Sequence, residues 1–156
     1  MDYFLLKQDE RYTNIPLLID VVKKIGPMNI QRLNAHKIPE SIIFYVQADK
    51  ETSYLDLLDR QLYLISDRLK KIVEKYTPDT LFKMLPLINL KQKRHENYYL
   101  PIFEEITALS PNSEFNPDQS VIKKLVLDAE KIKGKKIFKI KGSSKPLVAG
   151  PRQSQT

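Results

Sequence analysis

Residues 82–103 have the sequence FKMLPLINLKQKRHENYYLPIF, and this stretch determines how the rest of the chain can fold. Two apolar runs, 82–90 and 98–103, flank the polar segment 91–97, which contains several bases. Apolar runs on both sides of a polar turn predict a β-hairpin. Pro86 has no amide hydrogen for a sheet ladder, so we place its part of the first strand at an edge or a bulge. The sequence predicts a long hairpin with a basic tip.

The segments before this hairpin predict a strand, a second strand and a helix. Ile42–Val46 is rich in β-branched and aromatic residues, as buried strands are. Leu62–Ile65 is a further strand-like run that leads directly into Ser66 and Asp67. Ser66 is a favourable N-cap, and the apolar residues that follow recur at helical spacing up to Tyr76. We therefore expect a helix of about three turns after the second strand.

The N-terminal part predicts one more strand and one more helix. Tyr3–Leu6 is a short apolar run that ends in charged residues. Asn14 is a possible N-cap with Pro16 in the first turn, and apolar residues then recur at helical spacing as far as Gly26-Pro27. The polar segment 29–40 is expected to be a loop.

After the hairpin the pattern is weaker. Residues 121–127 fit a helix or a strand, and we favour a strand near Leu125–Leu127. Lys136–Lys141 alternates apolar and basic residues and is expected to be the last strand. The predicted fold is α+β in a single domain, residues 1–142, with a mostly antiparallel sheet and two or three helices. Residues 143–156 are rich in Ser, Gly, Pro and Gln and are expected to form a disordered or irregular tail.

The charge of the chain is unevenly distributed. The formal net charge is +7 over 156 residues, but all 19 acidic residues lie at or before Glu130. The last 24 residues hold seven bases and no acid, so residues 1–132 have no net charge. There is no Cys, and the longest apolar runs are far shorter than the roughly 20 residues of a membrane-spanning helix. Together with an N-terminus unlike a signal peptide, this leads us to expect a cytoplasmic protein with no membrane partner.

A search for catalytic and ligand-binding motifs predicts no catalytic residue, no metal site and no cofactor. The only histidines, His36 and His95, are far apart and fit no zinc-binding spacing. With four glycines the chain has no phosphate-binding loop, and it has no nucleophile elbow. The carboxylates Asp56 and Asp59 would meet only if they lay on one helical turn. We expect a binding protein and not an enzyme.

Nucleic-acid binding is the alternative function. The segment 91–99 mixes bases with two tyrosines, which is typical of single-strand binding surfaces, and the predicted last strand is also basic. The neutral charge of residues 1–132 makes this reading the weaker one.

Several segments together resemble a family of bacterial immunity proteins of polymorphic toxin systems, formerly a domain of unknown function and typified by a myxobacterial immunity protein. The matching segments are Tyr3–Leu6, Lys37–Pro39, Leu58–Arg60 before Leu64–Leu69, Tyr98–Pro101 and Ile137–Gly142. The resemblance covers residues 1–142. Members of the family continue after the strand at 137–141 with a further strand and a helix, whereas residues 143–156 have too few apolar residues for both. The chain therefore resembles a C-terminally truncated or altered member.

The resemblance implies a cytoplasmic protein that binds a cognate toxin domain, contact-dependent or secreted, and neutralises it by stoichiometric occlusion. It also implies that missing elements would leave a sheet edge open, through which a homodimer could form. The family has no catalytic motif to carry over, so we assign partner-binding residues only to loop and hairpin tips. These residues are His36, Lys37, Asp56, Asp59, Lys93, Arg94, Tyr98 and Tyr99.

Overall fold

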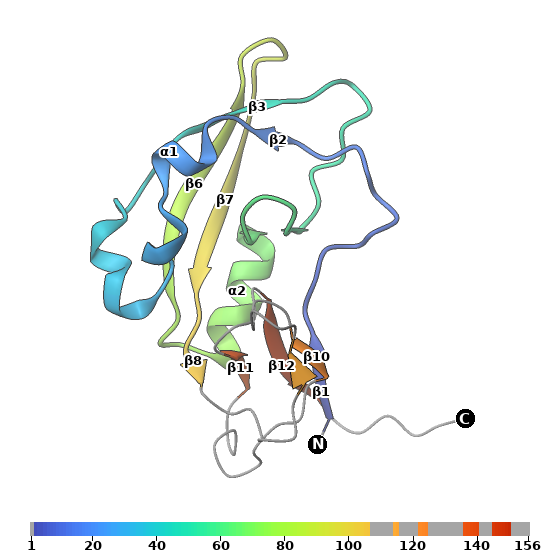
Figure 1. Ribbon diagram of the computed structural model, residues 1–156. Helices are drawn as coiled ribbons and strands as arrows, with labels where there is room; N and C mark the ends of the chain where they lie inside the picture. The colour runs from blue at the N-terminus through green and yellow to red at the C-terminus, as the bar shows by residue number, and fades with distance from the viewer. Residues whose placement is uncertain (1, 107–113, 116–121, 125–135, 141–144, 151–156) are drawn as a thin grey trace. The chain divides into compact units, whose positions relative to one another are not determined.

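A computed structural model describes residues 2–106, 114–115, 122–124, 136–140 and 145–150 (Figure 1). The contacts divide the chain into two compact units, one of Lys7–Ile102 and one that combines Met1–Leu6 with Phe103–Thr156. We call them the central unit and the terminal unit. Sheets of mostly antiparallel strands combine with helices, which confirms the predicted α+β class.

The central unit is a six-stranded sheet in the order β2-β3-β6-β7-β5-β4. All neighbours in it are antiparallel except β3 and β6. One α-helix of ten residues, one short α-helix and two 3₁₀ helices connect the strands. The elements are β2 (Leu17–Leu18), α1 (Val21–Lys24), η1 (Pro27–Asn29), η2 (Arg32–Lys37), β3 (Phe44–Gln47), β4 (Leu57–Leu58), β5 (Leu64–Ser66), α2 (Asp67–Tyr76), β6 (Leu81–Asn89) and β7 (Arg94–Ile102).

The predicted hairpin is the centre of this sheet. β6 and β7 pair without interruption from Leu81 opposite Ile102 to Asn89 opposite Arg94. The edge or bulge expected at Pro86 is wrong, because β6 lies between β3 and β7 and its register has no bulge. The Met84 amide donates to the Glu40 carbonyl on the β3 side, so the nitrogen of Pro86, two residues later, faces the same side. The parallel pairing with β3 resumes only at Leu87, so the missing donor falls in a gap of the ladder.

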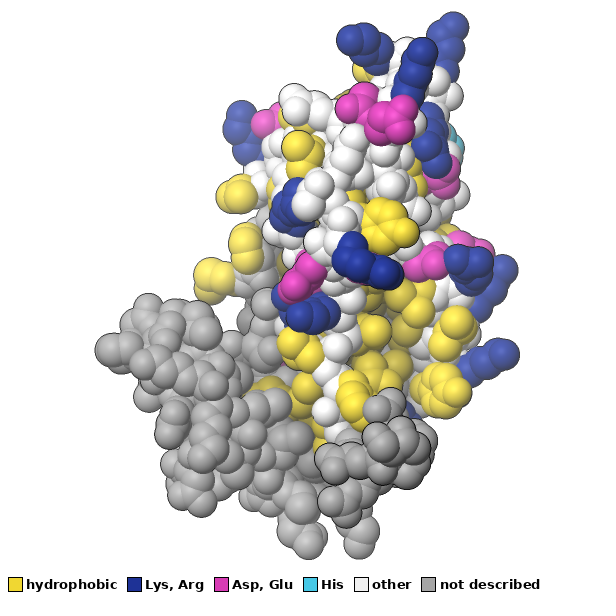
Figure 2. Space-filling model, turned by 90° about the vertical axis from the view of Figure 1, so that its right-hand side faces the viewer, with side chains coloured by type: hydrophobic (Ala, Val, Ile, Leu, Met, Phe, Trp, Pro, Cys, Tyr) yellow, Lys and Arg dark blue, Asp and Glu magenta, His cyan; other side chains and the backbone are white. Residues whose placement is uncertain are grey.

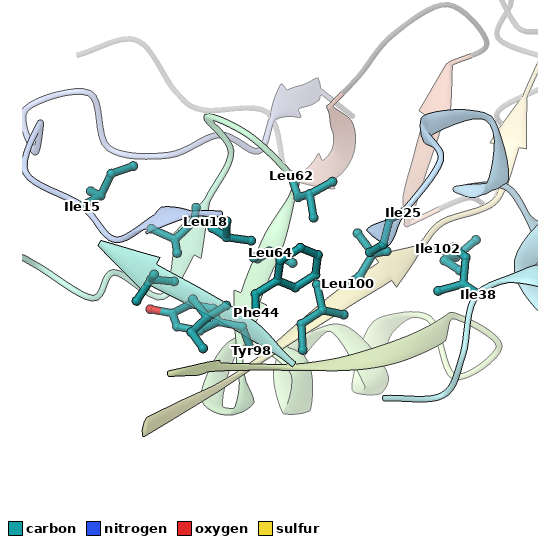
Figure 3. Close-up of a cluster of buried hydrophobic side chains, with 14 of the residues drawn as sticks. Ile15, Leu18, Ile25, Ile38, Phe44, Leu62, Leu64, Tyr98, Leu100 and Ile102 are labelled. Atoms are coloured by element: carbon teal, nitrogen blue, oxygen red, sulfur yellow. The ribbon is translucent and has the colours of Figure 1, made fainter. Parts of the chain in front are cut away.

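The core of the central unit lies on one face of the sheet (Figure 3). Fully buried residues of this face come from four strands, as Phe44, Leu64, Leu85 and Leu100 show. The segment between Ile15 and Ile38, which includes α1, η1 and η2, covers them. Helix α2 lies on the opposite face of the sheet from these side chains (Figure 3). We call the two sides the core face and the outer face.

The structure confirms the predicted cap of α2. Ser66 Oγ accepts a hydrogen bond of 3.2 Å from the Leu69 amide and donates one of 2.6 Å to Asp56 Oδ1. Asp67 in the first turn and Lys75 in the last turn suit the helix dipole.

The helix predicted after Asn14 is wrong. Residues Leu17–Leu18 form β2 instead, and only Val21–Lys24 is helical. The Asn14 side chain binds Asp49 and Thr52 and caps no helix. The expected loop at 29–40 contains the 3₁₀ helix η2, whose Ala35 packs in the core.

The terminal unit has a four-stranded sheet in the order β1-β12-β11-β8 and a two-stranded sheet of β9 and β10. The larger sheet has a small core of Phe138, Ile140 and Leu147. Tyr3 packs against this core, and its ring lies at 68° to that of Phe138. The strands are β1 (Asp2–Leu5), β8 (Glu105–Ile106), β9 (Glu114–Phe115), β10 (Ile122–Lys124), β11 (Ile137–Ile140) and β12 (Pro146–Gly150).

The terminal unit confirms the predicted strands at 3–6 and 136–141 but extends past them. Pro146–Gly150, expected to belong to an irregular tail, forms β12 between β1 and β11. Pro146 is the first strand residue, where a missing amide hydrogen is tolerated, and Leu147 is buried against Phe138. The strand favoured at 125–127 and the tail residues 143–144 and 151–156 lie outside the described residues.

Candidate interaction surface

Apolar residues of β2, β3 and β6 point to the outer face of the central sheet. Along β3, Phe44 and Val46 are buried in the core face, whereas Tyr45 between them is exposed. Ile88 of β6 is the register partner of Tyr45. Ile19 extends the row on the other side, since its amide donates to the Tyr45 carbonyl. These neighbours in register share one face of the sheet.

Helix α2 covers the other half of the outer face. The Lys70 ammonium lies 4.9 Å from the centre of the Tyr99 ring and 5.1 Å from that of Phe82. Val73 is buried and Ile65 of β5 is fully buried. The half over β2, β3 and the end of β6 remains accessible: Ile19 is 40% exposed, Tyr45 44% and Leu90 71%. We call Leu17, Ile19, Tyr45, Ile88 and Leu90 the outer apolar patch.

The outer apolar patch contains an open hollow of about 370 Å³. Its apolar lining is Ile19, Tyr45, Val46, Ala48, Ile88 and Leu90, and its polar lining is Gln47, Asn89 and Lys91. The buried Asn89 holds both sides of the hollow in place. Its side-chain amide donates to the Ala48 carbonyl, and its side-chain oxygen accepts from the Gln92 amide in the β6–β7 turn. The hollow is thus fixed by the fold before anything binds.

The one charge in the lining of the hollow is positive. It belongs to Lys91, and within the described part of the chain neither Lys91 nor Lys93 has a carboxylate partner. Lys24 donates to the Ile43 carbonyl, and its ammonium lies 5.6 Å from the centre of the Tyr45 ring. An apolar floor with a cationic rim can bind an apolar side chain that has carboxylates beside it.

The residues that the sequence nominated for partner binding do not form one surface. His36 and Lys37 are exposed at the end of η2. Asp56 accepts hydrogen bonds from Arg68 (2.5 Å) and Ser66, and these bonds lower its pKa. Asp59 accepts one from the Gln8 amide. The helical turn that would have paired Asp56 with Asp59 is absent, because β4 lies between them.

The hairpin candidates also have different environments. Tyr98 is a core residue, only 3% exposed, and cannot contact a partner; its hydroxyl donates to the Leu55 carbonyl, and burial raises its pKa. Tyr99 lies beside α2. The Arg94 guanidinium stacks on Tyr54, 3.8 Å from the ring centre, and forms an ion pair with Glu96. Lys93 is exposed in the turn.

The residues of the hollow were missed because the sequence signal is ambiguous. A run such as Ile42–Val46 predicts a buried strand, and this local pattern does not indicate that Tyr45 is exposed. Lys91 was recognised only as part of a basic turn. The local pattern also cannot predict which half of the outer face is buried, because this depends on where α2 packs.

The comparisons with known proteins add no family. A scan against protein-family models, a search of curated proteins and a search of solved structures each found no match to the chain. The resemblance to immunity proteins therefore stays a prediction. In the described residues, no group of three or more His, Asp or Glu side chains is arranged to hold a metal ion. No described helix has the length and hydrophobicity needed to cross a membrane.

Proposed function

We propose that this protein binds a toxin domain and neutralises it by stoichiometric occlusion, as the resemblance to immunity proteins implies. The observation that carries the binding part of the proposal is the outer apolar patch. Tyr45, Ile19 and Leu90 are exposed on a sheet whose other face is a closed core. Contiguous apolar side chains exposed beside charged ones are typical of protein-binding surfaces.

The rigidity of the central sheet supports this mode of action. The patch lies on strands whose alternate residues, Phe44 and Leu87, are almost completely buried. A surface held in this way loses little conformational entropy on binding, which favours a tight complex without turnover. Occlusion needs such a complex and no chemistry from the inhibitor.

Co-expression tests the proposed function. Each toxin domain encoded next to this gene is expressed with the full chain in a sensitive host, and survival is compared with that of cells that express the toxin alone. We expect one toxin to be neutralised and to copurify with the chain in a one-to-one complex. If the chain protected against none of these toxins, the proposal would be contradicted.

The exposed basic turn of the hairpin favours a second candidate, a nucleic-acid-binding module. In Figure 2, Lys and Arg side chains lie at the top of the view, which is the end that the β6–β7 turn occupies in Figure 1. Lys91 and Lys93 are exposed there. The predicted contribution of the basic strand β11 is smaller, since the Lys139 ammonium lies 3.6 Å from Glu105 Oε1. This candidate predicts binding of single-stranded DNA that weakens steeply with salt and is lost in a Lys91→Glu, Lys93→Glu double variant.

A further inference from the structure

The hollow beside the β6–β7 turn indicates the chemistry of the partner. Its floor is formed by Ile19, Tyr45 and Ile88, and its single charged lining residue is the cation Lys91. A volume of about 370 Å³ accommodates one large apolar or aromatic side chain. No carboxylate lines the hollow. An acidic residue next to the inserted side chain would therefore meet Lys91 without opposition from the lining itself.

We propose that the hollow receives an aromatic or large aliphatic side chain from an acidic segment of a partner protein. This inference rests on the proposed function for the kind of partner, a protein that is bound and occluded. It adds the place of contact and the chemistry of the bound segment. The inserted side chain contacts Tyr45, Ile88 and Leu90, and its flanking carboxylates approach Lys91 and Lys93. Lys24, which lies beside Tyr45, provides a third cation.

A second copy of this chain fits the surface less well. In a contact between two outer apolar patches, neither copy would offer a lining carboxylate to Lys91 of the other, so the charges would not be complementary. The edges of the central sheet offer no simple alternative. At β2, the Gln61 side chain accepts from the Leu18 amide (2.8 Å) and donates to the Leu18 carbonyl (2.9 Å). Beyond β4, the Gln8 amide donates to Asp59 Oδ2 and the Gln8 side-chain oxygen accepts from the Asp59 amide.

Nucleic acid also fits the hollow less well. Its lining has one cation and six apolar residues, whereas a phosphate chain needs several cations along its path. Tyr45 could stack on a base, but apolar Ile19 and Ile88 flank it. The two partner classes predict different responses to the same substitution. Loss of the apolar contact at Leu90 should abolish capture of an apolar side chain and leave phosphate binding by Lys91 and Lys93 in place.

The test is an NMR titration of the ¹⁵N-labelled full chain with defined probes. The first probe is a nine-residue peptide, Ser-Gly-Glu-Asp-Phe-Glu-Asp-Gly-Ser. Two matched peptides replace the Phe by Ala or all four acids by Lys, and a fourth probe is a single-stranded oligothymidine. We expect the first peptide to shift the amide resonances of Tyr45, Ile88 and Leu90 and to bind at least about tenfold more tightly than either matched peptide.

Two variants of the chain locate the binding. Leu90→Ser removes the apolar contact without adding a charge and should weaken binding of the first peptide by about tenfold or more. Leu33→Ser, which changes an 82% exposed leucine of η2 in the same way, should leave binding unchanged. The inference would be overturned if the Lys peptide bound equally well, if the shifts were centred elsewhere, or if no shifts were seen. It would also be overturned if the peptide failed to bind while oligothymidine bound equally to the parent chain and to Leu90→Ser.

The same variants separate this inference from the proposed function. If the unmodified chain and Leu90→Ser protect equally well against a neighbouring toxin, the function stands and the hollow is not the contact site. If no toxin is neutralised but the acidic peptide binds at Tyr45 and Ile88, the toxin proposal fails and the hollow remains a binding site for acidic proteins. Thermal unfolding of each variant shows that a lost signal reflects binding and not loss of the fold.

Discussion

The two faces of the central sheet are formed by alternate residues of the same strands, yet only the core face is covered along its whole length. Phe44 and Tyr45 are neighbours in β3, and one is fully buried while the other is 44% exposed. On the outer face, α2 covers the part near Phe82 and Tyr99 and leaves the part near Tyr45 and Ile88 accessible. Apolar side chains lie on both faces of the strands, but only those of the core face are covered throughout.

The open part of the outer face is where binding is expected. An apolar residue on a covered face stabilises the fold, whereas an apolar residue on an open face is available to a partner. The core face should therefore dominate the stability of the fold, and the open half of the outer face should contribute little to it.

The largest expected effect compares the neighbours Phe44 and Tyr45. Phe44→Ala should lower the free energy of unfolding by about 3–5 kcal/mol, because it removes a fully buried ring and leaves a cavity. Tyr45→Ala should cost about 1 kcal/mol or less, since its ring is partly in water already. Urea unfolding of both variants measures the difference. Similar losses would mean that the outer face is a second core and not a binding surface.

The next effect concerns the cover of the outer face. Ser66→Ala removes the N-cap of α2 and a hydrogen bond to Asp56, and it should cost about 1–2 kcal/mol. Asp56 adds a pH dependence, because Arg68 and Ser66 lower its pKa in the folded state. Its contribution is therefore present above the unfolded pKa of about 4 and is lost as the pH falls through the lower folded value.

Urea unfolding at neutral and acid pH checks this prediction. Asp56→Asn should lose part of the acid sensitivity below about pH 4, whereas Asp79→Asn, an exposed control, should keep it. An unchanged pH profile in Asp56→Asn would show that this carboxylate does not anchor the helix. The outer apolar patch should still bind its partner in Ser66→Ala, because the patch lies on the other half of the face.

The hairpin and α2 could be predicted from the sequence because their signals are local. Two apolar runs around a basic turn and a Ser-Asp pair before a helical stripe need no information from elsewhere in the chain. The segment after Asn14 misled for the opposite reason. Its apolar residues have helical spacing, but Leu17–Leu18 pairs with β3, and the Asn14 side chain binds the turn at Asp49 and Thr52.

The candidate site could be predicted only in part. The basic turn was recognised, but the hollow arises from the register of Tyr45 with Ile88 and of β2 with β3, which are long-range contacts. Tyr98 was nominated as a surface aromatic, and it is the residue of the Tyr98-Tyr99 pair that faces the core. Alternation along a strand predicts that one of two neighbours is buried, but it does not predict which one.

A smaller effect is expected at β2, the edge strand of the central sheet. Gln61→Ala removes both hydrogen bonds to the Leu18 backbone along this edge and should lower the free energy of unfolding by about 1 kcal/mol. It also leaves a strand edge unpaired, so the variant should self-associate more than the parent chain in sedimentation experiments. Gln47→Ala, at an exposed residue of β3, is the control and should stay like the parent. If Gln61→Ala were as stable and as monomeric as Gln47→Ala, the Gln61 side chain would not be needed to protect this edge.

The smallest expected effect is a gain in stability at Lys93. Its φ of 54° lies in the left-handed region, which costs a residue with a Cβ more than it costs glycine. Lys93→Gly should therefore raise the free energy of unfolding by about 0.5–1 kcal/mol, with the denaturant dependence unchanged because both faces keep their packing. Lys93→Ala removes the same charge without relieving the backbone and should be no more stable than the parent. Both variants lack the Lys93 side chain beside the hollow, and they differ from each other in backbone strain. If both bind the acidic peptide equally and more weakly than the parent, the loss of affinity comes from the missing lysine side chain and not from the backbone.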